Sequence, residues 1–134
     1  MKIIELTSEQ VSQLEDRLAE YDIAHTGAPL DSDISLGIMK DGQLIAGLDA
    51  CMTAYKILYV STVFVESDYR GQGYGKALMA QMERQAKELG ANMIRLDTFD
   101  WQGKAFYEAL GYEIVGSYEN LEDGFSEYFF LKRL

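Results

Sequence analysis

The sequence has only one cysteine, one proline and one histidine among its 134 residues. The single Cys51 cannot form a disulfide within the chain, and its neighbours have the pattern of a strand, so we expect a buried and inert thiol. One histidine and one cysteine cannot build a typical zinc site, so we expect no metal. The scarcity of proline, with no Ser/Gly tract and no block of like charge, predicts one domain over residues 1–134.

Long apolar runs are also missing. No stretch approaches the roughly 20 apolar residues of a membrane-spanning helix, and the N-terminal MKIIELTSEQ lacks the apolar core of a signal peptide. We therefore expect a cytoplasmic protein with no membrane partner.

Basic residues are scarce as well, with 12 Lys and Arg against 22 Asp and Glu and a formal charge of −10. Such a field repels polyphosphate polymers, so we expect no nucleic-acid partner. It attracts cations, which favours an amine-bearing small molecule or a basic peptide. Solubility alone is the alternative explanation of the charge.

Hydrophobic spacing predicts helices and strands in mixed order. Thr7 and Gln10 have the spacing of a capping box, which predicts a helix from about Ser8 to Tyr21 or a little beyond, ended by Gly27 and Pro29. The other expected elements are strands over about 34–38 and 44–48 with a turn at 41–42, a strand over 57–65, a helix over 75–89, a strand over 92–99, a helix over 104–110 and strands over 112–119 and 126–134. Hairpins that flank one strand–helix–strand unit predict a mixed sheet with helices.

The strand over 57–65, ILYVSTVFV, is apolar at nearly every residue, which predicts that both of its faces are covered. The C-terminal Tyr128, Phe129 and Phe130 either pair along an exposed strand edge in a homodimer or fill the core, and we favour the core.

The stretch YRGQGYGKA follows the strand over 57–65 and places glycines at 71, 73 and 75 between two cations. A Walker loop would need four residues between its glycines and a Ser or Thr after Lys76, and a dinucleotide fingerprint would need a glycine at position 76. Both patterns fail. A helix that starts near Gly75 would still aim free backbone N–H groups at this turn, which suits a diphosphate. The alternative is an ordinary helix-entry turn with solvated cations.

The motif Arg70-x-x-Gly73-x-Gly75, after VSTVFVESDY and before a helix, resembles the acyl-CoA-binding motif of GCN5-related N-acetyltransferases (GNAT), and FYEALGYEIVG resembles a later helix and strand of that family. The resemblance implies an α/β protein of mixed α+β type with the acyl-CoA N-acyltransferase fold, a mostly antiparallel sheet flanked by helices with two strands splayed at the cofactor site. It implies acetyl-CoA as co-substrate. By the same resemblance the cofactor would contact Val63, Phe64, Val65, Arg70, Gly71, Gln72, Gly73, Tyr74, Gly75 and Lys76.

Tyr107 matches the tyrosine that stands near the cofactor sulfur in many family members, so the resemblance makes it the preferred general acid for the leaving thiolate. We expect Phe106 to point inward and Tyr107 toward the cleft. The base stays open, because no carboxylate occurs between Ile57 and Val65 and the place where relatives carry a glutamate falls at about Tyr59. The remaining candidates are Glu66, Asp49, Asp97, His25 and a water chain.

The chain departs from the family at Asp100 and Gly103, where relatives often carry Asn and Ala. The candidates to replace the cofactor contact that this Asn usually makes are Gln102 and Lys104. Trp101 either walls the thioester pocket or covers the edge of the core. The resemblance favours direct transfer of an acetyl group to the amine of a small molecule or peptide in a ternary complex. A non-catalytic acyl-CoA sensor and a nucleotide-binding protein are the alternatives.

Overall fold

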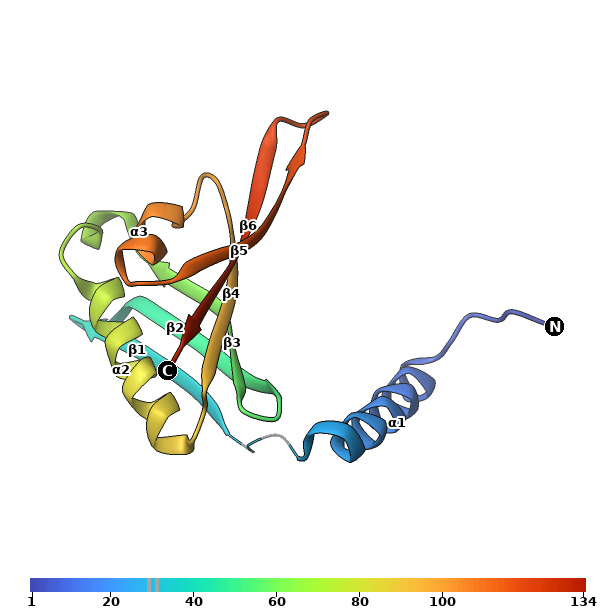
Figure 1. The fold of residues 1–134 in the computed structure, drawn as a ribbon. Helices are drawn as coiled ribbons and strands as arrows, with labels where there is room; N and C mark the ends of the chain where they lie inside the picture. The colour runs from blue at the N-terminus through green and yellow to red at the C-terminus, as the bar shows by residue number, and fades with distance from the viewer. Residues whose placement is uncertain (29, 31) are drawn as a thin grey trace.

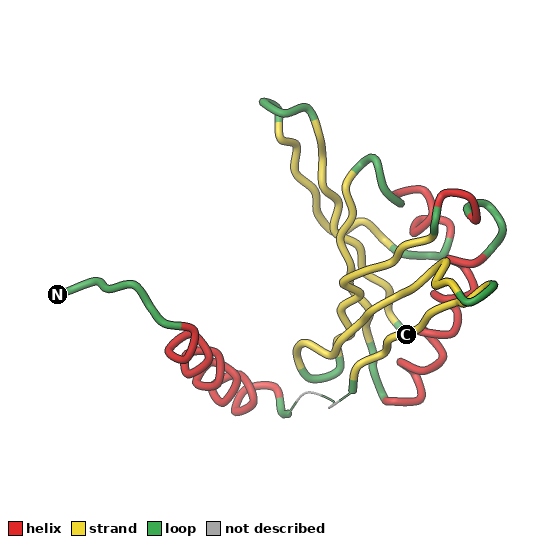
Figure 2. The backbone as a smooth tube through the Cα atoms, turned by 180° about the vertical axis from the view of Figure 1, so that it is seen from behind, coloured by secondary structure: helices red, strands yellow, loops and turns green. Residues whose placement is uncertain are grey.

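The computed structural model describes residues 1–28, 30 and 32–134 (Figures 1 and 2). Six strands form one sheet in the order β1-β2-β3-β4-β6-β5, in which only the β3–β4 pair is parallel. The elements are α1 (Ser8–Thr26), β1 (Asp33–Lys40), β2 (Gln43–Ala54), β3 (Ile57–Val65), a 3-10 turn (Ser67–Tyr69), α2 (Tyr74–Leu89), β4 (Met93–Phe99), α3 (Lys104–Ala109), β5 (Glu113–Asn120) and β6 (Phe125–Arg133). The expected mixed, mostly antiparallel sheet is confirmed.

One face of the sheet, here called the inner face, is covered by α2 and α3. Helix α2 turns Leu78, Met79, Met82 and Ala86 toward the strands and ends at Gly90, whose positive φ of 95° forms the cap. Alternate residues of the strands meet these side chains, so that the core lies between α2, α3 and the sheet. The buried strand residues of this face include Ile34, Leu48, Ala50, Leu58, Val60, Ile94, Leu96 and Phe130.

The opposite face, here called the outer face, is not covered by any helix of the described chain. Phe64 is 52% exposed and Asp49, Arg95 and Asp97 are also exposed, although their strand neighbours on the inner face are buried. The expectation that both faces of β3 are covered is therefore wrong. Its apolar pattern reflects packing on the inner face and leaves the aromatic ring of Phe64 in solvent.

Residues 1–26, here called the arm, project away from the body in both views (Figures 1 and 2). The capping box is present, since Gln10 N–H donates to the Thr7 hydroxyl oxygen at 3.2 Å and Thr7 N–H donates to Gln10 Oε1 at 2.9 Å. Helix α1 ends at Thr26, five residues beyond Tyr21, with Gly27 as its cap as expected, and none of its residues is buried. Pro29, the second expected stop signal, lies outside the described residues.

The C-terminal hairpin differs from expectation. Strand β6 lies between β4 and β5, so both of its edges are paired and β5 forms the edge of the sheet. Phe130 fills the core at 1% exposure, whereas Phe129 lies on the outer face at 37%. The core expectation therefore holds for Phe130 and fails for Phe129, because successive residues of a strand point to opposite faces. Cys51 lies on β2 as expected, but it is only half-buried.

Candidate active site

Strands β3 and β4 separate part-way along their length. Their pairing ends at Tyr59 and Arg95, after three residue pairs, although β3 continues to Val65 and β4 to Phe99. Beyond this point Val63, Phe64 and Val65 remain paired to β2 on their other side. Their β4-facing edge has no strand partner, so the sheet contains an opening bounded by unpaired backbone groups.

The N-terminus of α2 follows the end of β3. Gly73 is the cap residue with a positive φ of 88°, and no side chain caps the helix. The first hydrogen bond of the helix runs from Ala77 N–H to Gly73 O, so the amides of Tyr74, Gly75 and Lys76 lie ahead of it without a helical acceptor. A Cβ atom at Gly71 or Gly73 would meet nothing within 4 Å. The turn is therefore open to an anion on the side of its free amides.

Gly75 and Arg70 tie this turn to the opening in the sheet. A Cβ atom at Gly75 would lie 3.2 Å from Phe106 Cζ, so a side chain there would push against α3. Arg70 Nε donates to Val65 O at 2.9 Å, and the guanidinium lies 5.5 Å from the centre of the Phe64 ring. Arg70 thus holds the end of β3 in place in addition to adding positive charge near the amides.

Tyr107 lies on α3, on the inner side of the sheet. It is 9% exposed and its ring packs against Tyr112 and Phe130 at centroid distances of 6.0 and 5.8 Å. Burial, with a smaller contribution from the negative charge of Asp97, raises the pKa of Tyr107 to about 12. Phe106 points inward as expected, half-buried against the core and close to Gly75, and Tyr107 is the more buried of the two.

On the outer face a carboxylate lies where β3 and β4 separate. The Tyr59 hydroxyl donates to Asp97 Oδ2 at 2.9 Å, which joins the two strands just past their last backbone pair. Burial and this hydrogen bond raise the pKa of Tyr59. Beside them the Tyr118 hydroxyl donates to Glu127 Oε1, and this hydrogen bond raises the pKa of Tyr118. The structure thus gathers two carboxylates and two phenols on this part of the outer face.

The other candidate bases lie elsewhere. Asp49 lies on β2 and accepts a hydrogen bond from the Ser35 hydroxyl at 2.6 Å, and Glu66 follows the end of β3 in solvent. His25 lies on the projecting α1, where its Nδ1 is 2.8 Å from Tyr21 O. Only Asp97 among them affects the pKa of Tyr107. Sequence reasoning named Asp97, but its link to Tyr59 required the register of β3 against β4.

The turn between β4 and α3 is held by its own side chains. Gln102 Oε1 accepts from Phe99 N–H at 2.8 Å, and Asp100 Oδ2 accepts from Ser126 N–H at 3.1 Å. Lys104 lies 4.8 Å from the centre of the Tyr128 ring. Trp101 stacks on Phe99 and is 64% exposed, so it covers the edge of the sheet and does not close a pocket.

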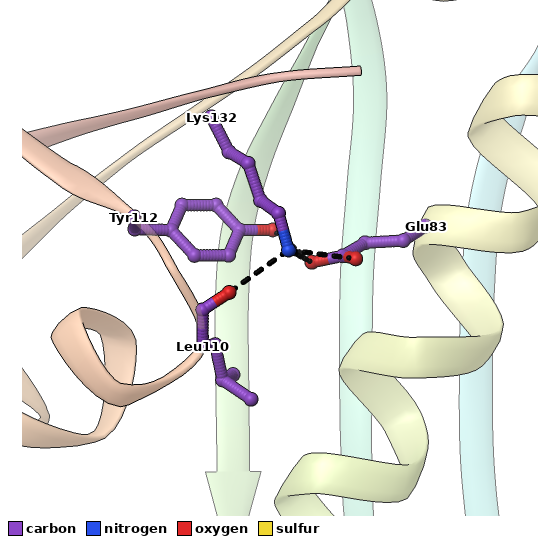
Figure 3. Close-up of polar contacts among 4 residues, drawn as sticks. All are labelled: Glu83, Leu110, Tyr112 and Lys132. Atoms are coloured by element: carbon purple, nitrogen blue, oxygen red, sulfur yellow. Dashed lines mark hydrogen bonds and ion pairs between the residues drawn. The ribbon is translucent and has the colours of Figure 1, made fainter.

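A polar cluster fixes α2 relative to α3 (Figure 3). Lys132 Nζ on β6 lies 3.1 Å from both carboxylate oxygens of Glu83 on α2 and donates to Leu110 O at 2.8 Å. The Tyr112 hydroxyl donates to the same carboxylate at 2.9 Å. This cluster therefore fixes the position of α2, which carries the free amides, relative to α3, which carries Tyr107. No sequence motif predicts the cluster.

Comparison with known proteins agrees with this geometry. The family model described as "Acetyltransferase (GNAT) family" matches residues 2–112. The chain belongs to the GNAT acetyltransferase family. Among curated relatives, an acetyltransferase of Agrobacterium fabrum is 30% identical over 87% of this chain and 85% of its own length. The blasticidin-S acetyltransferase of Streptomyces morookaense is 28% identical over 79% of this chain and 78% of its own length.

Solved structures of acetyltransferases share this fold over all or most of the chain. An acetyltransferase from Bacillus cereus has a TM-score of 0.90 and 27% identity, and the match covers 100% of this chain and 98% of that one. A streptothricin acetyltransferase from Bacillus anthracis, solved in complex with acetyl coenzyme A, has a TM-score of 0.67 and 24% identity over 76% of this chain and 62% of that one.

None of the helices in residues 1–28, 30 and 32–134 is long and apolar enough to cross a membrane. Within the same part of the chain, no group of three or more His, Cys, Asp or Glu side chains is arranged to hold a metal ion.

Proposed function

We propose that this GNAT acetyltransferase is an N-acetyltransferase that moves the acetyl group of acetyl-CoA to the amine of a small molecule or peptide. The observation that carries the proposal is the opening between β3 and β4, which has free helix amides at one end and a carboxylate and a phenol beside it. An anionic donor and a cationic acceptor can thus approach one gap from two sides.

The residues around the opening fit acetyl-CoA. The amides of Tyr74, Gly75 and Lys76 and the open space beside Gly71 and Gly73 suit the pyrophosphate. The unpaired edge of Val63, Phe64 and Val65 suits an extended amide-bearing chain such as pantetheine, which adds to the edge as a strand does. When bound, acetyl-CoA supplies a thioester with an electrophilic carbonyl.

Asp97 is the proposed contact for the amine. An alkylammonium has a pKa of about 10.4, so it arrives protonated and is attracted by a carboxylate. Tyr59 fixes the orientation of Asp97 through the 2.9 Å hydrogen bond. In this arrangement Asp97 holds the ammonium and accepts its proton, directly or through a water, so that the nitrogen can attack.

Tyr107 is the proposed acid. Because burial raises the pKa of Tyr107 to about 12, its hydroxyl stays protonated at neutral pH and can give a proton to the departing sulfur. No protein group among the described residues accepts a hydrogen bond from this hydroxyl. Its proton is therefore available to a bound ligand.

The acceptor class follows from charge. The outer face brings Asp97 and Glu127 together in a chain with a formal charge of −10, which selects for cations over anions. A small-molecule amine, as in the blasticidin-S acetyltransferase relative, and a basic peptide both meet this requirement. Acetyl transfer to an acceptor of either kind involves neither a nucleic acid nor a metal ion in this proposal.

The test is release of free thiol from acetyl-CoA with a panel of small amines and basic peptides, with the mass of each product measured. Tyr107→Phe is expected to lower turnover at saturating acetyl-CoA about 100-fold or more, with little change in the Kd of coenzyme A. Asp97→Asn is expected to raise KM for the amine and leave KM for acetyl-CoA unchanged. Binding of acetyl-CoA with no transfer to any member of the panel would favour the sensor alternative.

A further inference from the structure

We propose that the arm of one copy of this chain lies on the outer face of a second copy, so that two chains exchange their arms. The arm carries an apolar stripe formed by Val11, Leu14, Leu18 and Tyr21. These residues recur at intervals of three and four and so share one side of α1. All four are exposed, by 41%, 52%, 61% and 65% respectively.

An arm of this kind is not stable alone in water. Isolated helices of fewer than about 12–15 residues are marginal and longer ones gain most of their stability in proteins from packing of an apolar side. Helix α1 has 19 residues and buries none of them. Nine large apolar side chains between Met1 and Ile23 are exposed, so the arm requires a surface that covers them.

The outer face of β1, β2 and β3 offers such a surface. Gly37 pairs with Gly47, and Gly47 pairs with Phe64, so two of three neighbouring positions carry no side chain. The resulting hollow of about 340 Å³ is lined by Leu44, Gly47 and Phe64 among others, and Leu44 is 62% exposed. The Leu44 side chain lies over Gly37, where an added Cβ would be 2.9 Å from Leu44 Cδ1, so the open part of this surface is at Gly47 beside Phe64.

Charges of both signs lie on the outer face: Asp49 and Glu66 line the hollow, and two arginines lie outside it. Helix α1 carries five acidic residues and one arginine, on the sides that flank its apolar stripe and behind it. The outer face presents two arginines over aromatic rings of β3, with Arg70 at 5.5 Å from the Phe64 centroid and Arg95 at 4.3 Å from the Tyr59 centroid. The acidic sides of α1 can pair only with these two arginines, while its apolar stripe lies against the hollow.

The connection between arm and body directs the arm outward. Leu30 N–H donates to Tyr55 O at 3.0 Å, which holds the segment after α1 at the β2–β3 turn. The Tyr55 ring also packs on Gly27, where an added Cβ would lie 3.0 Å from Tyr55 Cε2. The arm therefore leaves at one end of the sheet and projects away from the body without lying on its own sheet (Figure 1).

The Bacillus cereus relative supports an outward arm. The arm is about a fifth of the chain, and the alignment with that structure covers all of this chain at a TM-score of 0.90. An arm folded back in the relative would remove up to a fifth of the score. The high score over the full chain supports the outward arm, in which the apolar stripe is left for another molecule.

The area suits a second copy. Burial of one large apolar side chain removes on the order of 100 Å² from water. Reciprocal exchange buries the stripe and the N-terminal apolar residues of both arms, which reaches the roughly 800 Å² per partner of a stable interface. The contact is isologous, because each chain gives an arm and receives one.

The exchange also completes the acceptor side of the proposed active site, an inference that rests on the proposed function. Tyr59 and Asp97 lie on the same face as the hollow, since Tyr59 pairs with Cys51 in the alternation that includes Asp49 and Gly47. A partner arm in the hollow therefore forms one wall beside Asp97 and limits which amines can reach it.

Light scattering on the full-length protein tests the exchange without any assay of activity. We expect the wild-type mass to be twice 15.1 kDa, and the Leu14→Glu/Leu18→Glu double variant to be monomeric. Ser12→Glu/Gln13→Glu, which adds the same charges on the opposite side of α1, is the matched control and stays dimeric. Leu44→Glu on the receiving face gives monomers as well.

A monomeric wild type would overturn the exchange, and so would a dimer that survives either the double variant or Leu44→Glu. Unfolding is not a concern for the double variant, because neither side chain is buried, and circular dichroism verifies this. If acetyl transfer is found, the monomeric variant is expected to show a raised KM for the amine with KM for acetyl-CoA unchanged. Failure of that kinetic effect alone removes only the wall beside Asp97, whereas the mass measurement decides the exchange.

Discussion

Helices α1 and α2 are similar in length and both are amphipathic, but they differ in what they contact. Each carries apolar residues at intervals of three and four, yet α2 buries four of its side chains and α1 buries none. Their N-termini differ in the opposite sense. The first turn of α1 is closed by the Thr7–Gln10 capping box, whereas α2 begins at Gly73 with no side-chain cap. The helix that is packed is thus the one with amides left for a ligand.

An amphipathic helix requires a surface that covers its apolar side, but the sequence pattern of the helix does not identify that surface. Helix α2 meets its partner surface within the β3–α2–β4 unit, because the strands on either side of it in the sequence lie beneath it. Helix α1 precedes the sheet and leaves from its far end, where no described element of its own chain lies against it.

The largest expected change in stability comes from replacing an apolar residue of α2 with a charged one, compared with the same replacement in α1. Met82→Glu places an unpaired carboxylate at a site of 0% exposure and is expected to cost about 4 kcal/mol or more of unfolding free energy. Leu18→Glu adds the same charge at 61% exposure, where its cost arises only through loss of the partner arm. Thermal unfolding at several protein concentrations separates the two. A Tm loss in Leu18→Glu that does not depend on concentration would contradict the comparison.

High pH is expected to lower the unfolding free energy through tyrosines on the inner face of the sheet. Burial raises the pKa of Tyr107 to about 12, and burial with the nearby Glu83 carboxylate also raises the pKa of Tyr112. Between pH 10 and 12 the unfolded chain has lost the Tyr107 proton and the folded protein keeps it, so the unfolding free energy falls as pH rises. The stabilisation is fully present below pH 10, and its loss amounts to about 2.7 kcal/mol for Tyr107.

Denaturant titrations at stepped alkaline pH measure this loss. Tyr107→Phe is the control, because a phenyl ring cannot ionise; the curve should become less steep, with the remaining decline due to Tyr112. An equally steep decline in that variant would show that other groups cause it.

The open N-terminus of α2 gives the next effect. Gly73→Ala puts a Cβ atom beside the free amides and strains a positive φ, so we expect the Kd of coenzyme A to rise about tenfold, which is 1.4 kcal/mol. Gly124→Ala is the matched control, since Gly124 also has a positive φ with nothing within 4 Å of its Cβ but lies in the β5–β6 turn. Each substitution costs roughly 1 kcal/mol of stability through backbone strain. Calorimetry that finds equal losses of affinity in both would refute a phosphate site at Gly73.

The smallest effect is expected at the capped N-terminus of α1. Thr7→Ala removes the hydroxyl that accepts from Gln10 N–H and should cost about 1 kcal/mol of helix stability. Far-UV circular dichroism is expected to report fraying of α1, with no change in coenzyme A affinity. Ser8→Ala, one residue along, leaves the capping box intact and serves as the reference.

Local signals were sufficient for most of the fold. The capping box, the Asp41-Gly42 turn and the glycine cap at 90 each act within a few residues, so their expectations are confirmed. Helix α3 ends one residue earlier than expected, with Leu110 as its cap and Gly111 at a positive φ just after it. The glycine turn at 71–75 was also visible, because positive φ and close approach leave few residue choices. The Tyr59–Asp97 hydrogen bond and the Lys132–Glu83 ion pair join residues 38 and 49 positions apart, and no local pattern encodes such contacts.

The sequence by itself determined the elements, the α2 entrance and the family, since these depend on short-range backbone preferences and on a motif of neighbouring residues. Tertiary structure alone decided that β3 packs on one face, that Tyr107 is more buried than Phe106 and that α1 lies apart from the sheet. The physical reason is that apolar spacing is the same whether a side chain meets its own core or another molecule. Only the path of the chain selects between them.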